Sequence, residues 1–226
     1  MRFITDQDFR EYLVDGMART YRDCQACPLS RHRTNVVLGD GPLEPLLAII
    51  GEAPRDGADD YGVPFHESDE PSRLLRRALE KVEIDVERDA WMTYVVSCQP
   101  RDDRKARPEE RRACTERLHA EMRIVKPYVI LCLGKAALHH VCLNIHRSDS
   151  LGKHRGLVKK QHWPYASFGG CGTANLKSVF ATYDPAYLIR MQGSADQRRI
   201  SHRFGQDLRN VKRVLDKVAK KVRKTG

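Results

Sequence analysis

The chain has 226 residues, with 40 Lys or Arg against 30 Asp or Glu, so its formal net charge is +10 at pH 7. Its seven cysteines are an odd number, and the N-terminus lacks the apolar core of a signal peptide. No apolar stretch is long enough to span a bilayer. These features argue against a disulfide scaffold and a membrane protein, and we expect a soluble, cytoplasmic monomer that folds as one domain over residues 1–226.

Segments typical of strands and helices alternate along the chain. A first helix is expected from about Asp6 to Arg22. Short apolar runs predict buried strands at 46–50, 91–96, 128–133 and 178–183. Helices are predicted to begin at Pro71, Pro108, Gly134 and Pro185, and a basic amphipathic helix is predicted at about 206–224. This alternation predicts an α/β fold with a mostly parallel sheet covered on both faces, whereas residues 144–175 are expected to be mostly loop.

Four cysteines are spaced as candidate metal ligands. Cys24 and Cys27 share one tight turn, and Cys98 and Cys114 follow at distant points of the chain. Four thiolates suit zinc or an iron–sulfur cluster. Cys24 and Cys98 are flanked by polar residues, so burial as small apolar side chains explains them poorly. That alternative does explain the three cysteines in apolar or glycine-rich runs, which are Cys132, Cys142 and Cys171.

Positive charge is concentrated in two segments. Residues 101–112 carry six Lys or Arg against four acids, and residues 209–224 carry eight against a single Asp. Such clustering attracts polyanions, nucleic acid first among them. For the C-terminal segment, a solvated helix face is an equal alternative. In the first segment, we expect phosphate contacts from Arg101, Arg104 and Lys105.

Two chemically distinctive loops follow the first and the fourth predicted strands. Residues 51–65 are rich in glycine, proline and acidic residues and end at Phe65, and residues 183–187 contain Asp184. In parallel α/β folds, sites lie at the carboxyl ends of the strands, so these loops are the expected walls of a site. By itself the first loop is also compatible with a surface loop that contributes one core phenylalanine.

Taken together, the motifs resemble those of the iron–sulfur uracil-DNA glycosylases known as family 4, within the uracil-DNA glycosylase superfamily. The resemblance runs from about Cys24 to Arg190 and rests on Cys24-x-x-Cys27-x-Leu29, Arg33-Thr34, Gly39-Asp40-Gly41, Gly51-Glu52-Ala53-Pro54, Gly62-Val63-Pro64-Phe65, the Cys98 and Cys114 pair, Leu133-Gly134 and Thr182-Tyr183-x-Pro185. It implies a three-layer α/β/α sandwich around a four-stranded, mostly parallel sheet. It also implies a structural [4Fe–4S] cluster on the four cysteines and stacking of Phe65 on a base flipped out of DNA. The implied reaction is hydrolysis of the N-glycosidic bond between uracil and deoxyribose.

Four positions depart from the family pattern. Arg55 stands where glycine is usual, Ala58 where an acidic residue is usual, Tyr94 where an asparagine reads uracil, and Asp184 where a histidine precedes the proline. An ionised Asp184 would repel the negative charge that a histidine stabilises on the departing uracil. Tyr94 offers one hydroxyl in place of an amide and is bulkier, so it fills part of the pocket.

The candidate catalytic carboxylates are Asp59, Glu52 and Asp184, which would orient water or stabilise the sugar cation. Asp59 is the preferred candidate, because by the resemblance it holds the place of the family's aspartate. The candidate base-binding residues are Phe65, Tyr94 and Ala53. Two structural alternatives stay open, namely Asp184 as the N-cap of the helix at Pro185 and Tyr94 as a core residue. Three functions also stay open: excision of uracil or another altered base, modification of a flipped base without excision, and DNA binding without catalysis.

Overall fold

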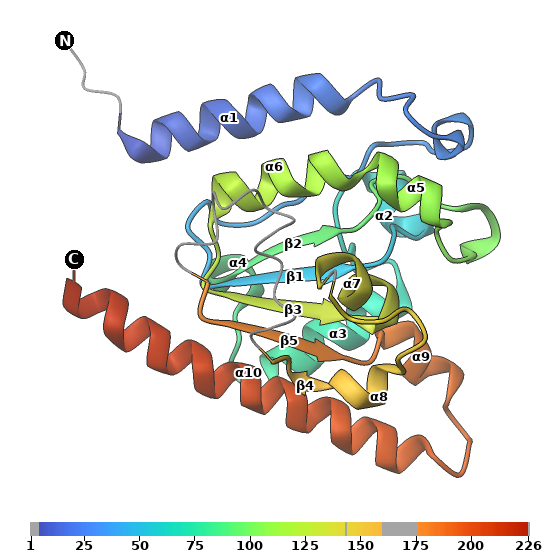
Figure 1. The fold of residues 1–226 in the computed structure, drawn as a ribbon, viewed down its shortest axis with the longest axis vertical. Coiled ribbons are helices and arrows are strands. Elements are labelled where there is room, and N and C mark those ends of the chain that lie inside the picture. The colour runs from blue at the N-terminus through green and yellow to red at the C-terminus, as the bar shows by residue number, and fades with distance from the viewer. Residues whose placement is uncertain (1–4, 143, 160–175, 226) are drawn as a thin grey trace.

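The computed structural model describes residues 5–142, 144–159 and 176–225. Its strands form one sheet in the order β2-β1-β3-β5-β4 (Figure 1), and they are β1 Leu47–Gly51, β2 Ala90–Tyr94, β3 Val129–Leu133, β4 Gly156–Leu157 and β5 Ser178–Thr182. Strands β1, β2, β3 and β5 are parallel, and β4 pairs antiparallel with β5. The described α-helices are α1 Asp6–Tyr21, α2 Asp56–Tyr61, α3 Glu70–Glu80, α4 Val86–Asp89, α5 Pro108–Ala113, α6 Thr115–Val125, α7 Gly134–Val141, α8 Leu151–His154, α9 Pro185–Arg190 and α10 Gln197–Thr225.

The four predicted strands are confirmed, and each begins within one residue of its predicted start. The sheet has a fifth strand, β4, so the expectation of four strands is corrected to five. Strand β4 has only two residues and lies in the stretch expected to be mostly loop, so no apolar run marks it. Helix α2 was not predicted either, because the acids and glycines of its sequence resemble those of a loop. Residues 160–175, which include Cys171, lie outside the described part of the chain.

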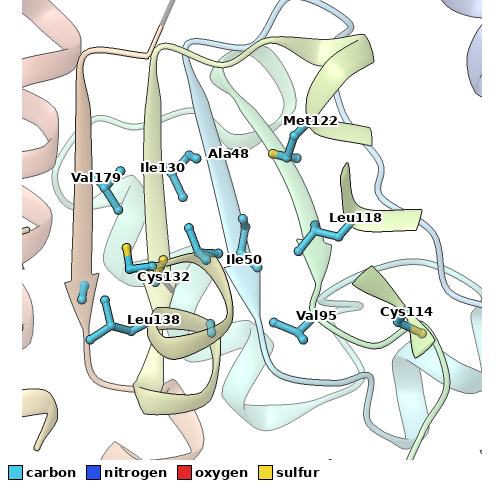
Figure 2. Close-up of a cluster of buried hydrophobic side chains, with 14 of the residues drawn as sticks. Ala48, Ile50, Val95, Cys114, Leu118, Met122, Ile130, Cys132, Leu138 and Val179 are labelled. Atoms are coloured by element: carbon cyan, nitrogen blue, oxygen red, sulfur yellow. The ribbon is translucent and has the colours of Figure 1, made fainter. Parts of the chain in front are cut away.

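Alternate residues of each strand face opposite sides of the sheet. One side chain set, which includes Ala48, Ile50, Ile130 and Cys132, packs with Leu118 and Met122 of α6 and Leu138 of α7 (Figure 2). The other set, which includes Leu47, Ile49, Val129 and Leu131, packs with residues of α3, α9 and α10. Every residue of the four parallel strands is buried. Two helical layers therefore enclose the sheet, as expected for a three-layer α/β/α sandwich.

Helix α10 confirms the predicted basic C-terminal helix but begins earlier, at Gln197. Phe204, Leu208 and Val211 recur at helical spacing and are buried against the sheet. The opposite face leaves Arg213 and Lys217 exposed. Among the described residues, no helix is both long and apolar enough to cross a membrane.

The parallel strands bring their carboxyl ends to one edge of the sheet (Figure 1). Gly51, the last residue of β1, is paired with Tyr94, the last residue of β2. Leu133, the last residue of β3, is likewise paired with Thr182, the last residue of β5. The loops that follow these strands are therefore neighbours in space although they are far apart in the sequence.

Candidate active site and cysteine cluster

A cavity of about 1070 Å³ lies at the carboxyl ends of the four parallel strands. This volume is slightly above the usual range of ligand pockets, about 300–1,000 Å³. Its walls include residues that follow each strand: Glu52 and Ala53 after β1, Tyr94 at the end of β2, Gly134 after β3 and Asp184 after β5. Helices α5, α6 and α7 contribute further walls. The two loops singled out in the sequence thus meet at one cavity.

Phe65 and Tyr94 form an aromatic wall of this cavity. Their rings are stacked with centroids 4.5 Å apart, and the side chains are 6% and 4% exposed. A Cβ atom at Gly51 would lie 2.8 Å from Phe65 Cζ and 2.8 Å from Tyr94 Cδ1, so the stack requires glycine there. Tyr94 covers one face of Phe65, and a flipped base therefore has to use what remains of that ring.

The backbone of Phe65 is held in an unusual conformation. Its φ of 51° lies in the left-handed region, which residues other than glycine rarely adopt. The Phe65 N–H donates a hydrogen bond of 2.8 Å to the buried Tyr94 hydroxyl. Burial raises the pKa of Tyr94 well above its ordinary range, so the hydroxyl is neutral at physiological pH. Tyr94 is both a buried residue and a cavity-lining residue, which joins the two interpretations left open by the sequence.

Among the described residues, three carboxylates line the cavity, Glu52, Asp184 and Asp103, and the first two lie at the ends of strands. Glu52 Oε1 accepts a 3.0 Å hydrogen bond from the Ala106 N–H and lies 3.9 Å from Arg111 Nη1. Asp184 Oδ1 accepts a 2.7 Å hydrogen bond from the Ala186 N–H and so caps α9. Burial raises the pKa of both Glu52 and Asp184, and the charge of Asp184 adds to the rise for Glu52. The capping role of Asp184 is confirmed, and the same side chain faces the cavity.

Asp59, in contrast, is not among the residues that line the cavity. It is 2% exposed on α2, and its oxygens accept hydrogen bonds from the Thr34 N–H at 2.7 Å and the Asn35 N–H at 3.2 Å. These contacts anchor the segment after Arg33 to α2. Its neighbour Ala58 is fully buried in the core that contains Phe65. The geometry therefore favours a structural role for Asp59, which the sequence could not reveal because α2 resembled a loop.

The three residues expected to contact phosphates have different surroundings. Arg104 and Lys105 line the cavity, whereas Arg101 is exposed and is not among the lining residues. Arg104 forms two hydrogen bonds of 2.9 and 2.6 Å with Glu110, whose side chain is 1% exposed. Lys105 is exposed and therefore more available to an external ligand than Arg104.

Further cations around the cavity were not predicted from the sequence as ligand-binding residues, although Arg55 was noted as a departure from the family pattern. Single basic residues from separate segments line the same cavity, and they are Arg55, Lys135, Arg147 and Arg190. Because they do not form a cluster in the sequence, no composition signal marks them. Arg55 Nη1 forms an ion pair with Asp103 Oδ2, and the next residue, Asp56, accepts a hydrogen bond from the Gln99 side chain. These two contacts connect the loop after β1 to the loop after β2.

The four candidate metal ligands are free thiols drawn from three separate segments. Cys98 and Cys114 are buried, and Cys24 and Cys27 are partly buried. Burial raises the pKa of Cys98 to about 12, and the nearby charges of Cys114 and Cys27 act in the same direction. Arg33 Nη1 lies 3.6 Å from Cys98 Sγ and supplies a positive charge beside the sulfur.

These thiols bear on the two metal interpretations left open by the sequence. Across the described ranges, no three His, Cys, Asp or Glu side chains gather closely enough to hold one metal ion. The donor set of four thiols suits either zinc or an iron–sulfur cluster. Cys132 and Cys142 are buried in the core beside β3 and α7, as expected for structural residues.

Comparison with known proteins covers most of the chain. The family model of the uracil DNA glycosylase superfamily matches residues 38–208. The type-4 uracil-DNA glycosylase of Thermotoga maritima is 35% identical over 191 residues, which are 84% of this chain and 90% of the relative. That of Saccharolobus solfataricus is 29% identical over 203 residues, covering 89% and 86%, and that of Pyrobaculum aerophilum is 34% identical over 137 residues, covering 60% and 68%. With the cavity built from the same motifs, these matches show that the chain belongs to the uracil-DNA glycosylase superfamily and, within it, to the type-4 family.

Proposed function

We propose that this protein is a DNA glycosylase that hydrolyses the N-glycosidic bond of uracil or of another altered base flipped out of DNA. The observation that carries the proposal is the cavity walled by Phe65 at the carboxyl ends of the strands, inside the span matched by the superfamily. Enzymes that act on a base take it out of the stack and hold it in a pocket between aromatic and apolar side chains. The cations around the cavity supply the attraction for DNA phosphates on which such binding depends.

Glu52 is the carboxylate best placed to assist hydrolysis. As the glycosidic bond breaks, positive charge develops on the sugar and a water molecule must attack C1′. The Glu52 side chain lines the cavity and is held by the Ala106 N–H, so its orientation is preorganised. We assign Glu52 to orient the water or stabilise the sugar cation, and Asp59 to hold the backbone at Thr34 and Asn35.

The changed residues bear on which base is excised. Tyr94 covers one face of Phe65 and presents a hydroxyl already engaged by the Phe65 N–H, so it reads the base edge differently from an amide. Asp184 has an acceptor oxygen and suits a base that presents an N–H or amino donor. Uracil excision by the natural protein should therefore be weak, and Tyr94→Asn combined with Asp184→His should increase it. A double variant that folds but gains no uracil excision would contradict this account of the pocket.

We further propose that Cys24, Cys27, Cys98 and Cys114 hold a [4Fe–4S] cluster. When bound, the cluster supplies a covalent cross-link among three segments: the turn after α1, the loop after β2 and the junction of α5 and α6. A protein that depends on such thiolates suits a reducing compartment, and we place it in the cytoplasm. Because one chain supplies all the walls of the cavity, a monomer suffices for the reaction on DNA.

Product analysis tests the proposed function and separates its alternatives. Purified protein is incubated with oligonucleotides that carry uracil, hydroxymethyluracil, hypoxanthine or xanthine. A free base together with an abasic site supports the glycosylase. An altered base that is still attached supports base modification, and neither product supports DNA binding without catalysis. The control is Phe65→Ala, which should lower excision because base–aromatic stacking contributes about 1–3 kcal/mol.

A further inference from the structure

Arg55 places a cation in the wall of the cavity that is proposed to hold the base. It follows Pro54 in the loop after β1 and lines the cavity together with Phe65, Tyr94 and Asp184. Its positive charge lowers the pKa of both Asp184 and Tyr94, although burial outweighs it in each case. The guanidinium is therefore within electrostatic reach of the aromatic wall and of the carboxylate at the end of β5.

The ion pair with Asp103 holds Arg55 in place and leaves most of its N–H donors available. Arg55 is 30% exposed and uses one terminal nitrogen, Nη1, for the Asp103 carboxylate. A guanidinium has five N–H donors, so others remain for a ligand in the cavity. The Asp56 contact with Gln99 holds the adjacent residue to the same loop. Arg55 is thus a preorganised donor rather than a freely moving surface side chain.

The other cations around the cavity are placed for different contacts. Arg104 is engaged by Glu110, and Arg111 lies beside Glu52. Arg190 is exposed and lies over the Tyr187 ring, 5.9 Å from its centroid. Lys135 and Arg147 are exposed on the side formed by α7 and the loop beyond it. The exposed positions of Lys135, Arg147 and Arg190 suit contacts with the DNA backbone, whereas Arg55, within electrostatic reach of Tyr94 and Asp184, suits a contact with the base.

We propose that Arg55 is a catalytic residue that stabilises the negative charge on the departing pyrimidine base, an inference that rests on the proposed function. In the reaction, the C1′–N1 bond breaks and its electron pair stays on the base. A water oxygen then bonds to C1′ and loses a proton, and the departing base takes up one proton. A donor that is already fixed before the reaction stabilises such developing charge better than solvent, which has to reorganise around it. Arg55 also offsets the charge of Asp184, which would otherwise oppose departure of the base.

A leaving-group series tests this role. Uracil and 5-fluorouracil are placed in the same oligonucleotide, and single-turnover excision rates are measured for the wild type, Arg55→Gln, Arg55→Lys and the control Arg147→Gln. Fluorine withdraws electrons and makes the base anion more stable, so this base depends less on the cation. For Arg55→Gln we expect a loss of about 100-fold on uracil, the size seen when one charge-stabilising donor is removed, and a clearly smaller loss on 5-fluorouracil. Arg55→Lys should recover part of the uracil rate, and any loss for Arg147→Gln should be equal on the two bases.

Two further measurements keep the outcomes distinct. Affinity for an uncleavable DNA carrying 2′-fluoro-2′-deoxyuridine should change little in Arg55→Gln, because the residue acts on charge that develops during the reaction. Equal losses on both bases, or a loss of affinity that accounts for the loss of rate, would identify a phosphate contact and overturn the role of Arg55. A wild type that excises other altered bases but neither of these two overturns this inference and leaves the proposed function intact. A wild type that excises no base overturns both.

Discussion

The hydroxyl of Tyr94 should control both the stability of the fold and the placement of Phe65. Tyr94→Phe keeps the stacked ring and removes the acceptor of the 2.8 Å hydrogen bond from the Phe65 N–H. That N–H is then buried without a partner, which costs about 1–3 kcal/mol. For a chain of this size, each kcal/mol lowers the unfolding midpoint by about 2–4 °C. Phe65 also loses the bond that holds its left-handed backbone, with φ of 51°.

The assay combines thermal unfolding with single-turnover excision of the preferred base. If Phe65 relaxes toward an extended backbone, its ring leaves the base site and the stacking energy of about 1–3 kcal/mol is lost. The excision rate should then fall by roughly 5-fold to 160-fold, since about 1.36 kcal/mol corresponds to a factor of ten. Tyr12→Phe is the matched control, because it removes the same atom from a side chain that is 65% exposed on α1. The reasoning is refuted if Tyr94→Phe unfolds at the wild-type temperature and excises at the wild-type rate.

Three further predictions concern pH, the cysteines and DNA binding. Burial lowers the pKa of His140 from 6.5 to about 4, so the unfolded chain binds this proton more tightly than the folded chain, and the stability present above pH 6.5 is lost toward pH 4. Urea unfolding of the wild type should show a loss of roughly 3 kcal/mol over this range that His140→Gln does not show. Equal pH dependence in the two proteins would contradict the prediction. Metal analysis should give about four irons per chain, as a [4Fe–4S] cluster requires. The Cys24→Ser variant should lose this iron, and the Cys132→Ala variant should keep it. A colourless protein that contains one zinc would exclude the cluster. Lys105→Gln should reduce the slope of log affinity against log salt concentration by about one unit. Arg104→Gln should instead lower the free energy of unfolding by about 1–3 kcal/mol, because the buried carboxylate of Glu110 loses two hydrogen bonds. An unchanged slope in the Lys105 variant would move the phosphate contact to another part of the surface, with α10 the next candidate.

The sequence by itself determined the central part of the fold. Strands buried on both faces must be nearly continuous apolar runs, so residues 47–51 and 129–133 were recognisable without any tertiary information. Because the predicted strands are parallel, their carboxyl ends lie at one edge of the sheet. The loop at Glu52, after the first strand, and the loop at Asp184, after the fourth, were therefore predicted to meet there. The dual character of Asp184 was also readable, because an aspartate before proline favours a helix N-cap wherever the chain then turns.

The tertiary structure decided what each polar side chain does, because hydrogen-bond partners are brought together only by folding. The two oxygens of Asp59 accept hydrogen bonds from N–H groups more than twenty residues earlier in the chain, and Asp59 does not line the cavity. Tyr94 and Phe65 become one unit through a contact that spans 29 residues. Arg55 gains a fixed orientation from Asp103, 48 residues away. Local patterns report the face and period of an element, whereas the chemistry of this site depends on long-range partners, so it emerged only from the folded chain.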